Sequence, residues 1–164
     1  MLNKSDRFFI KGFVQSMKFL LAIYESDLQK LKCILEKYPY IAAAYLFGSQ
    51  AKGTVWQMSD VDIAILVNDK APTGRELLHD ESYLSYQLSK IFGGKEVDLV
   101  NLKSQGLIFQ HTVLRTGRVI YDSDKDYRIR FETRVICNYC DFEPTLRFMD
   151  KFYLQGRLRR LARL

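Results

Sequence analysis

The residues best suited to chemistry lie in the stretch LFGSQAKGTVWQMSDVDIAIL, which spans residues 46–66. It holds a Gly-Ser pair, Gly48 and Ser49, and then two aspartates one residue apart, Asp60 and Asp62, at the start of an apolar run. Side chains alternate between the two faces of a strand, so both carboxylates should project to the same side. Two anions this close repel each other, and the arrangement becomes favourable when divalent cations lie between them.

A third carboxylate extends the pattern. Asp98 lies in the apolar run EVDLV, much as the first two aspartates lie in theirs. Carboxylate oxygens suit Mg²⁺, which binds one or two protein carboxylates together with the phosphate oxygens of a substrate. Three acids from two strands are the usual protein part of a two-metal site for phosphoryl or nucleotidyl transfer. We therefore predict Asp60, Asp62 and Asp98 to be catalytic residues and ligands of two Mg²⁺ ions.

The Gly-Ser pair fits the phosphate end of the same chemistry. A glycine lets backbone N–H groups approach an anion closely, and a serine hydroxyl donates to a phosphate oxygen. If Ser49 opens a helical turn, the positive end of the helix dipole also lies at the phosphate. We predict that Gly48, Ser49 and Lys52 bind the nucleotide. The alternatives are an exposed turn lysine at Lys52, a turn-capping Asp60 and a solvated edge-strand acid at Asp98.

The elements that must position these residues alternate between strands and helices. Apolar spacing predicts strands over 40–48, 59–67, 95–102 and 118–122, and helices over 5–37, 75–92, 104–116 and from about 124 onward. Ser104 can cap the third of these helices, and Gly117 fits the left-handed position after its end. Pro144 should kink or divide the last helix.

The length and the element order indicate the fold class. At 164 residues the chain is long enough to bury a core and fits one domain. Helices, then a strand-rich centre with interleaved helices, then helices again predict an α/β (α+β) domain. Its parts are an N-terminal helical segment (1–39), a sheet core that carries the site (40–122) and C-terminal helices (123–164).

The basic charge of the chain is concentrated at its end. The formal net charge is +6, but the last ten residues, QGRLRRLARL, contain four arginines and no acid. Without them, 21 basic and 19 acidic residues remain. The Arg-rich tail could contact RNA, an anionic membrane or an acidic protein, or it could be the solvated face of a terminal helix. The rest of the chain lacks the broad basic surface expected of an RNA-binding enzyme.

The cysteines and the hydropathy indicate a cytoplasmic protein. Cys33, Cys137 and Cys140 give no even-numbered disulfide framework, and the CNYC pair lacks a second pair of zinc ligands. Packed or partly buried thiols in a reducing compartment are therefore expected. No run approaches the ~20 apolar residues that a membrane span requires.

The motif resembles that of a known superfamily. GSQAKGTVWQMSDVD is similar to the G-S-x10-D-x-D signature of the DNA polymerase β-like nucleotidyltransferases, and Asp98 looks like their third carboxylate. The small size and the sequences VDLVNL, GRVIYD and YCDFEP resemble the minimal nucleotidyltransferases of the MntA antitoxin type. The resemblance covers roughly residues 40–150. The N-terminal helical stretch and the Arg-rich tail lie outside it.

This resemblance implies a nucleotidyltransferase fold, with a small mixed sheet flanked by helices, and a specific activity. MntA-type proteins are encoded beside a HEPN-domain ribonuclease toxin, HepT, and they transfer AMP from ATP to a tyrosine of that toxin, which silences it. By resemblance, Asp60, Asp62 and Asp98 hold the metal ions, and Asp98 also helps to deprotonate the tyrosine. Ser49 and the backbone of Gly48 would hold the β,γ-phosphates.

Other functions remain open at the level of sequence. The acceptor could be a small-molecule hydroxyl, as in aminoglycoside-modifying enzymes, or an RNA 3′ end, although the chain is short for either. The protein could also be an antitoxin that neutralises its partner by binding alone. The joint presence of three acids and the serine favours an enzyme, because a degenerate copy would be expected to lose one of them.

Overall fold

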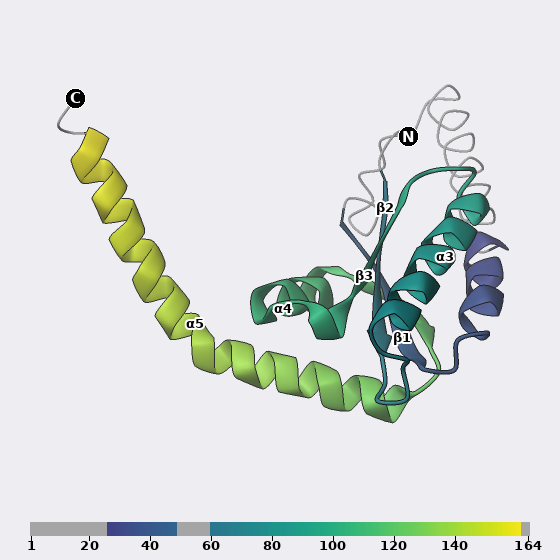
Figure 1. The fold of residues 1–164 in the computed structure, drawn as a ribbon. Helices are drawn as coiled ribbons and strands as arrows, with labels where there is room; N and C mark the ends of the chain where they lie inside the picture. The colour runs from purple at the N-terminus through teal and green to yellow at the C-terminus, as the bar shows by residue number, and fades with distance from the viewer. Residues whose placement is uncertain (1–25, 49–59, 162–164) are drawn as a thin grey trace, which may run out of the picture.

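The computed structural model describes residues 26–48 and 60–161. Ser49, Lys52, most of the predicted first helix and the end of the Arg-rich tail lie outside the described residues. Within them, the predicted architecture is confirmed: a four-stranded mixed sheet with helices on both sides (Figure 1). No helix in these ranges is both long and apolar enough to cross a membrane.

The sheet has the order β3-β2-β1-β4. Its strands are β1 (Ile41–Phe47), β2 (Val61–Val67), β3 (Val97–Asn101) and β4 (Arg118–Asp122). The central strand β1 runs antiparallel to both of its neighbours, whereas β2 and β3 are parallel. Because β2 and β3 are parallel, both strands begin at the same end of the sheet.

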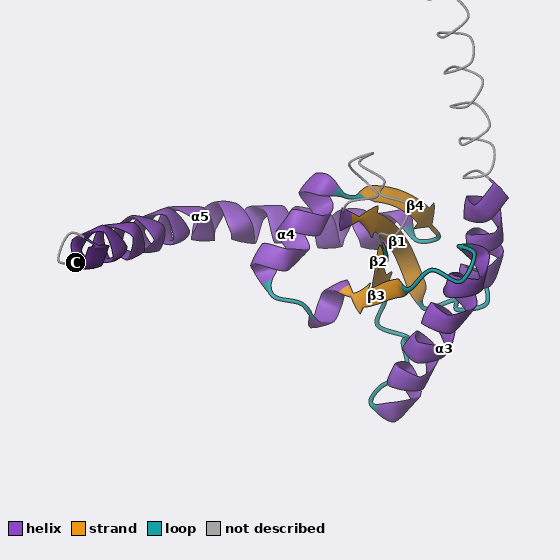
Figure 2. Ribbon diagram, turned by 90° about the horizontal axis from the view of Figure 1, so that it is seen from above, coloured by secondary structure: helices purple, strands orange, loops and turns teal. Residues whose placement is uncertain are grey.

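Helices cover both faces of the sheet (Figure 2). A helical segment over 26–35 and α3 (Arg75–Ile91) pack on one face. The short 3-10 helix η1 (Leu102–Ser104), α4 (Leu107–Thr116) and the first part of α5 (Lys125–Leu161) pack on the other. A strand buried on both faces reads as a continuous apolar run, which explains the sequences of β1 and β2.

The alternation along β2 assigns its side chains to the two faces. Val61, Ile63 and Ile65 belong to the core beneath α3, and each is at most 1% exposed. Ala64 and Leu66 are fully buried in the core beneath α4 and α5. Asp62 shares the parity of Ala64 and Leu66, and its side chain therefore belongs to the α4–α5 face.

A polar network fastens the base of α5 to the sheet. The Tyr45 hydroxyl donates to the Glu132 carboxylate (2.9 Å), and burial together with this hydrogen bond raises the pKa of Tyr45 well above its usual value. The Arg128 guanidinium donates to Glu132 (2.9 Å) and to Asp122 at the end of β4 (2.8 Å). Charged partners in a partly buried setting hold each other more firmly than surface pairs do.

The helix predicted from Ser104 begins later than expected. The Ser104 hydroxyl donates to the carbonyl of Asn101 (2.8 Å) within the 3-10 turn, so it does not cap α4. The turn itself is capped by the Asn101 side chain, which accepts from the Lys103 backbone N–H (3.1 Å). Gly106 stands at the N-cap of α4.

The left-handed conformation predicted for Gly117 is also wrong. Its φ and ψ are −83° and 166°, which is extended backbone open to any residue. Glycine is needed there for space, because a Cβ atom would lie 2.6 Å from the Val113 carbonyl oxygen and 3.2 Å from that of Leu46. The positive-φ glycines that end α3 are Gly93 and Gly94, as their position after the helix predicts.

Pro144 bends the last helix without dividing it. It lies near the middle of α5, which continues to Leu161, and Figure 1 shows α5 changing direction part-way along. A proline removes one backbone hydrogen bond and its ring displaces the carbonyl one turn earlier, which is a common cause of a bend.

The prediction of packed or partly buried cysteines is wrong, because Cys33, Cys137 and Cys140 are all exposed. The helices that carry them pack through other positions. Leu31 and Leu35 are the buried residues of the first helical segment, and Phe131 and Val135 are those of α5.

Replacing Gly117 with alanine should destabilise the fold by about 1–3 kcal/mol, since two backbone carbonyls crowd the new methyl group. Gly106→Ala is the matched control, because Gly106 also has a negative φ (−69°) and no heavy atom lies within 4 Å of the point where its Cβ atom would stand. It should lower the unfolding free energy by less than about 1 kcal/mol, the cost of replacing a glycine N-cap with alanine. Urea unfolding measures both, and equal losses would contradict the crowding argument.

Candidate active site

The parallel register of β2 and β3 brings two of the predicted acids together. Asp62 and Asp98 are direct partners in this pairing, as are Val61 and Val97 before them. The Val61 backbone N–H donates to the Glu96 carbonyl (3.0 Å) and sets the register where both strands begin. Partners in a parallel pair project from the same face, so the two carboxylates lie side by side at this end of the sheet.

The electrostatics of this pair are unfavourable without a cation. Burial raises the pKa of Asp62, and the neighbouring carboxylates of Asp98 and Asp60 raise it further. Asp62 thus loses part of its hydration and faces two other negative groups. A divalent cation would offset all three effects, because it supplies positive charge between the carboxylates.

The glycine turn after β1 lies against the same carboxylate. Phe47, the last residue of β1, pairs with Asp62 on β2, and Gly48 follows with a φ of 71°. A Cβ atom at Gly48 would overlap the carboxylate of Asp62. Glycine is therefore required twice, by its positive φ and by the close approach of backbone to carboxylate. The Gly-Ser and Asp-x-Asp parts of the motif meet here, while Ser49 and Lys52 lie outside the described residues.

Asp60, the third predicted acid, lies near the pair but does not complete a set of three metal ligands with it among the described residues. The strand predicted over 59–67 begins only at Val61, so Asp60 precedes β2 and is exposed instead of lying on the strand with Asp62. Its charge still contributes to the raised pKa of Asp62. Within 26–48 and 60–161, no three His, Cys, Asp or Glu side chains are arranged to hold a metal ion by themselves. The donor set nevertheless fits Mg²⁺, which commonly takes only one or two carboxylates and completes its shell with water and phosphate oxygens.

A groove beside Asp98 was not anticipated from the sequence. It has a volume of about 440 Å³ and is lined by α3 and β3, through Leu78, Glu81, Ser82, Ser85, Val97, Asp98 and Leu99. The Ser85 hydroxyl donates to the Val97 carbonyl (2.8 Å) and ties the helix to the edge of the sheet. No sequence motif marks this groove, because it exists only once α3 lies along the edge strand.

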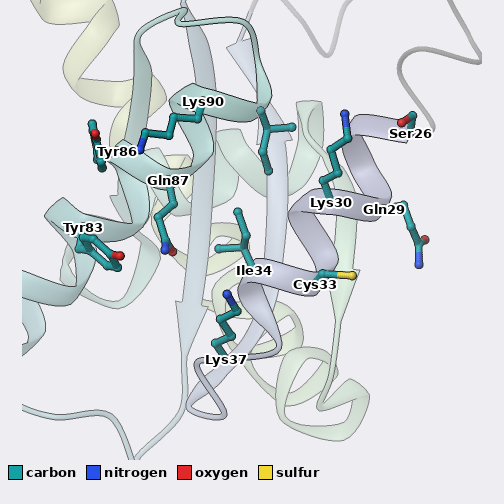
Figure 3. Close-up of a pocket in the computed structure, with 11 residues that line it drawn as sticks. Ser26, Gln29, Lys30, Cys33, Ile34, Lys37, Tyr83, Tyr86, Gln87 and Lys90 are labelled. Atoms are coloured by element: carbon teal, nitrogen blue, oxygen red, sulfur yellow. The ribbon is translucent and has the colours of Figure 1, made fainter.

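A larger hollow of about 790 Å³ lies between the 26–35 helical segment and α3 (Figure 3). Its charged lining residues are Lys30, Lys37 and Lys90, and Lys90 lies over the ring of Tyr86 (4.2 Å to the centroid). Both helices cover the sheet face opposite to that of Asp62. Size alone therefore does not identify the reactive site, and we assign that site to the carboxylates.

Adjacent carboxylates where two parallel strands begin, beside a glycine turn on a small mixed sheet, are the arrangement expected of a nucleotidyltransferase. The chain belongs to this family: the family model described as polymerase beta, nucleotidyltransferase, matches residues 29–126. The matched region contains Gly48, Asp60, Asp62 and Asp98.

Two curated relatives carry the name protein adenylyltransferase MntA. The chain is 28% identical to the protein of Aphanizomenon flos-aquae over 109 residues, which are 63% of this chain and 71% of that protein. It is 26% identical to the protein of Shewanella oneidensis over 112 residues, which are 66% of this chain and 73% of that protein.

Solved structures share the fold. A toxin–antitoxin structure with AMP-PNP contains a chain that is 24% identical, with a TM-score of 0.63, covering 77% of this chain and 98% of that chain. A second structure holds the tri-AMPylated HEPN toxin of Shewanella oneidensis in complex with the MNT antitoxin. Its matching chain is 21% identical with a TM-score of 0.60, covering 79% of this chain and 98% of that chain.

Gly48→Ala should reduce nucleotidyl transfer by at least about 100-fold, because the new methyl group displaces Asp62 from its position beside the turn. Gly93→Ala separates this effect from backbone strain. Gly93 has nearly the same φ (69°), but a Cβ atom added there would have no heavy atom within 4 Å. The control should lose some stability and keep its activity, and equal activity losses in both variants would contradict the role of the contact with Asp62.

Asp62→Asn should raise the melting temperature at neutral pH, without divalent cations, by a few degrees. A carboxyl whose folded pKa is raised binds its proton more tightly when folded, so its ionised form destabilises the fold above that pKa. The gain should shrink as the pH falls through the raised pKa of Asp62. Added Mg²⁺ should stabilise the wild type and leave the variant unchanged.

Asp69→Asn is the control, because the pKa of Asp69 is shifted in the opposite direction to that of Asp62. Hydrogen bonds from Lys103 and Tyr127 lower the pKa of Asp69, so its ionised form stabilises the fold above the unfolded value. This variant should therefore melt at a slightly lower temperature at neutral pH. Differential scanning calorimetry between pH 3 and 8 measures both, and a loss of stability in Asp62→Asn at neutral pH would refute the electrostatic account.

Proposed function

We propose that this protein is a Mg²⁺-dependent protein adenylyltransferase that transfers AMP from ATP to a tyrosine of a HEPN-domain toxin of the HepT type, and so acts as its antitoxin. The observation that carries the proposal is the pairing of Asp62 with Asp98 beside Gly48, in a chain of the nucleotidyltransferase family. The names of the relatives supply the acceptor, since they describe adenylyltransferases and an AMPylated HEPN toxin. A reaction between ATP and a ribonuclease toxin would take place in the cytoplasm.

Each acid has a role in this proposal. Asp62 and Asp98, with Asp60 at the entrance to β2, would hold Mg²⁺, which neutralises charge on the phosphates when bound. Asp98 would accept the proton of the tyrosine hydroxyl, since it is the exposed acid beside Asp62 on the edge strand β3. The tyrosine oxygen bonds to the α-phosphorus of ATP as the bond to the β-phosphate oxygen breaks. Pyrophosphate leaves in line with the attack.

The glycine turn would hold the other end of ATP. Gly48 would offer its backbone N–H, while Ser49 and Lys52 would supply a hydroxyl and a positive charge to the β,γ-phosphates. Positioning and charge neutralisation supply most of the catalysis, because phosphoryl transfer asks little covalent chemistry of the protein.

The test uses ATP labelled on the α-phosphate, Mg²⁺ and a HEPN-domain protein of the HepT type. We expect label on a tyrosine of that protein, with the rate reduced by about 100-fold or more in Asp60→Asn and in Asp62→Asn. Asp126→Asn, which changes an exposed acid in the first turn of α5, should match the wild type.

Two outcomes would redirect the proposal. Full neutralisation of the toxin by Asp62→Asn, with no label transferred by the wild type, would establish an antitoxin that acts by binding alone. Label that passes to a small-molecule hydroxyl or to an RNA 3′ end, and not to the protein, would establish one of the other acceptors.

A further inference from the structure

The distal part of α5 is a helical arm with no partner in the described chain. We use "the arm" for residues 142–161. Figures 1 and 2 show this part of α5 extending away from the sheet and from the other helices. Its large apolar side chains are mostly exposed: Phe148 62%, Met149 58%, Phe152 56%, Tyr153 61% and Leu154 59%.

These side chains form a stripe along the arm. Phe148 and Phe152 are one helical turn apart and their rings are in contact, with centroids 4.5 Å apart. Met149 and Tyr153 are also one turn apart and directly adjoin the two phenylalanines. Four neighbouring side chains of this size make a continuous apolar surface, which marks an interaction site when it is exposed on a folded protein.

The stripe continues the side of α5 that packs in the core. Val135, which is 3% exposed, packs in the core beneath α5. Phe142 and Met149 follow at successive steps of seven residues, which is two helical turns and returns to nearly the same side. The pattern that buries the first half of α5 thus runs on past the body of the protein, as it does where a second surface completes the packing.

The chemistry of the stripe favours a protein partner. Aromatic residues and methionine are enriched at the centres of protein–protein interfaces, where a few of them carry most of the binding energy. Arg147 is bonded to Glu143 one turn earlier (2.9 Å), and the ring of Tyr153 lies beneath Arg157 (5.9 Å). A helix without tertiary contacts is also marginal in water, so a partner that covers the stripe would stabilise the arm.

The position of the arm selects among partners. The first part of α5, from which the arm extends, packs on the sheet face that holds Ala64 and Leu66. Asp62 projects from that same face. A protein bound along this side of α5 is therefore on the catalytic side of the sheet, where the acceptor of a nucleotidyl group must be. A second copy of this chain, in contrast, would not need to bind on the catalytic side of the sheet.

We propose that the apolar stripe of the arm is the docking surface for the acceptor protein, the HEPN toxin, and that it presents the acceptor tyrosine to the acidic pair. This rests on the proposed function for the identity of the partner. The arm binds and the carboxylates react, so affinity for the whole toxin and chemistry at the tyrosine reside in separate parts of the chain.

The test separates binding from chemistry with the double variant Phe148→Asp, Phe152→Asp. Its Kd and its KM for intact toxin should rise by about 100-fold, while kcat at saturating toxin stays within about two-fold of the wild type. Transfer to a short synthetic peptide that carries the acceptor tyrosine should be unchanged, because a peptide does not need the arm. A second pair, Phe148→Ala with Phe152→Ala, keeps the helix and should show the same pattern.

Tyr83→Asp is the matched control. Tyr83 is 51% exposed and lies on α3, which covers the opposite face of the sheet, so this variant should bind toxin as the wild type does. Toxin binding unchanged in both arm variants would overturn the proposal and leave the proposed function standing. Light scattering that shows a wild-type dimer and a monomeric arm variant, with toxin binding intact, would overturn it in favour of self-association.

Failure of the proposed function would look different. In that case the wild type transfers no label to toxin or peptide. Loss of toxin binding in the arm variants, measured by calorimetry without ATP, would still support the docking surface.

Discussion

The parallel pairing of β2 and β3 places two carboxylates next to each other at the start of both strands, and the rest of the site depends on that repulsive contact. The strands are held in register by backbone hydrogen bonds and by side chains buried on both faces, so Asp62 and Asp98 cannot separate to relieve their repulsion. Packing in the core therefore holds the two carboxylates together against their repulsion, and the electrostatic potential at this end of the sheet is negative. In the proposed function, this potential attracts a cation and the phosphates that accompany it.

The glycine turn places backbone directly beside this negative potential. Gly48 brings the backbone against the carboxylate of Asp62, where a side chain would overlap it. The glycine turn and the acidic pair therefore meet where β1 ends and β2 begins.

Sequence predicted the parts of this arrangement that depend on short-range periodicity. The alternation that starts at Asp62 along β2, the buried run of β1 and the glycine pair after α3 all follow from local rules, and the structure agrees with them. Asp60 is also predicted on the same strand, but it lies one residue before β2 begins. The predictions that were wrong concern features that depend on how elements pack together. Glycine is required at 117 by the carbonyl of Val113 one helical turn earlier and by that of Leu46 on β1. The Ser104 hydroxyl is bonded within a 3-10 turn, and the cysteines lie on the solvent side of their helices. The groove along α3 and the exposed arm depend on how whole elements are placed, which periodicity does not specify.

The network at the base of α5 has a mechanical consequence. From Arg128 to Phe152 the helix extends for roughly 36 Å at 1.5 Å per residue, with the bend in between. Rotating such a lever by one degree at its base moves its tip by roughly 0.6 Å, so an error of a few degrees would displace a docked protein by more than a hydrogen bond can tolerate. The contacts among Tyr45, Glu132, Arg128 and Asp122 are therefore the pivot whose stiffness sets how accurately anything held at the far end is aimed.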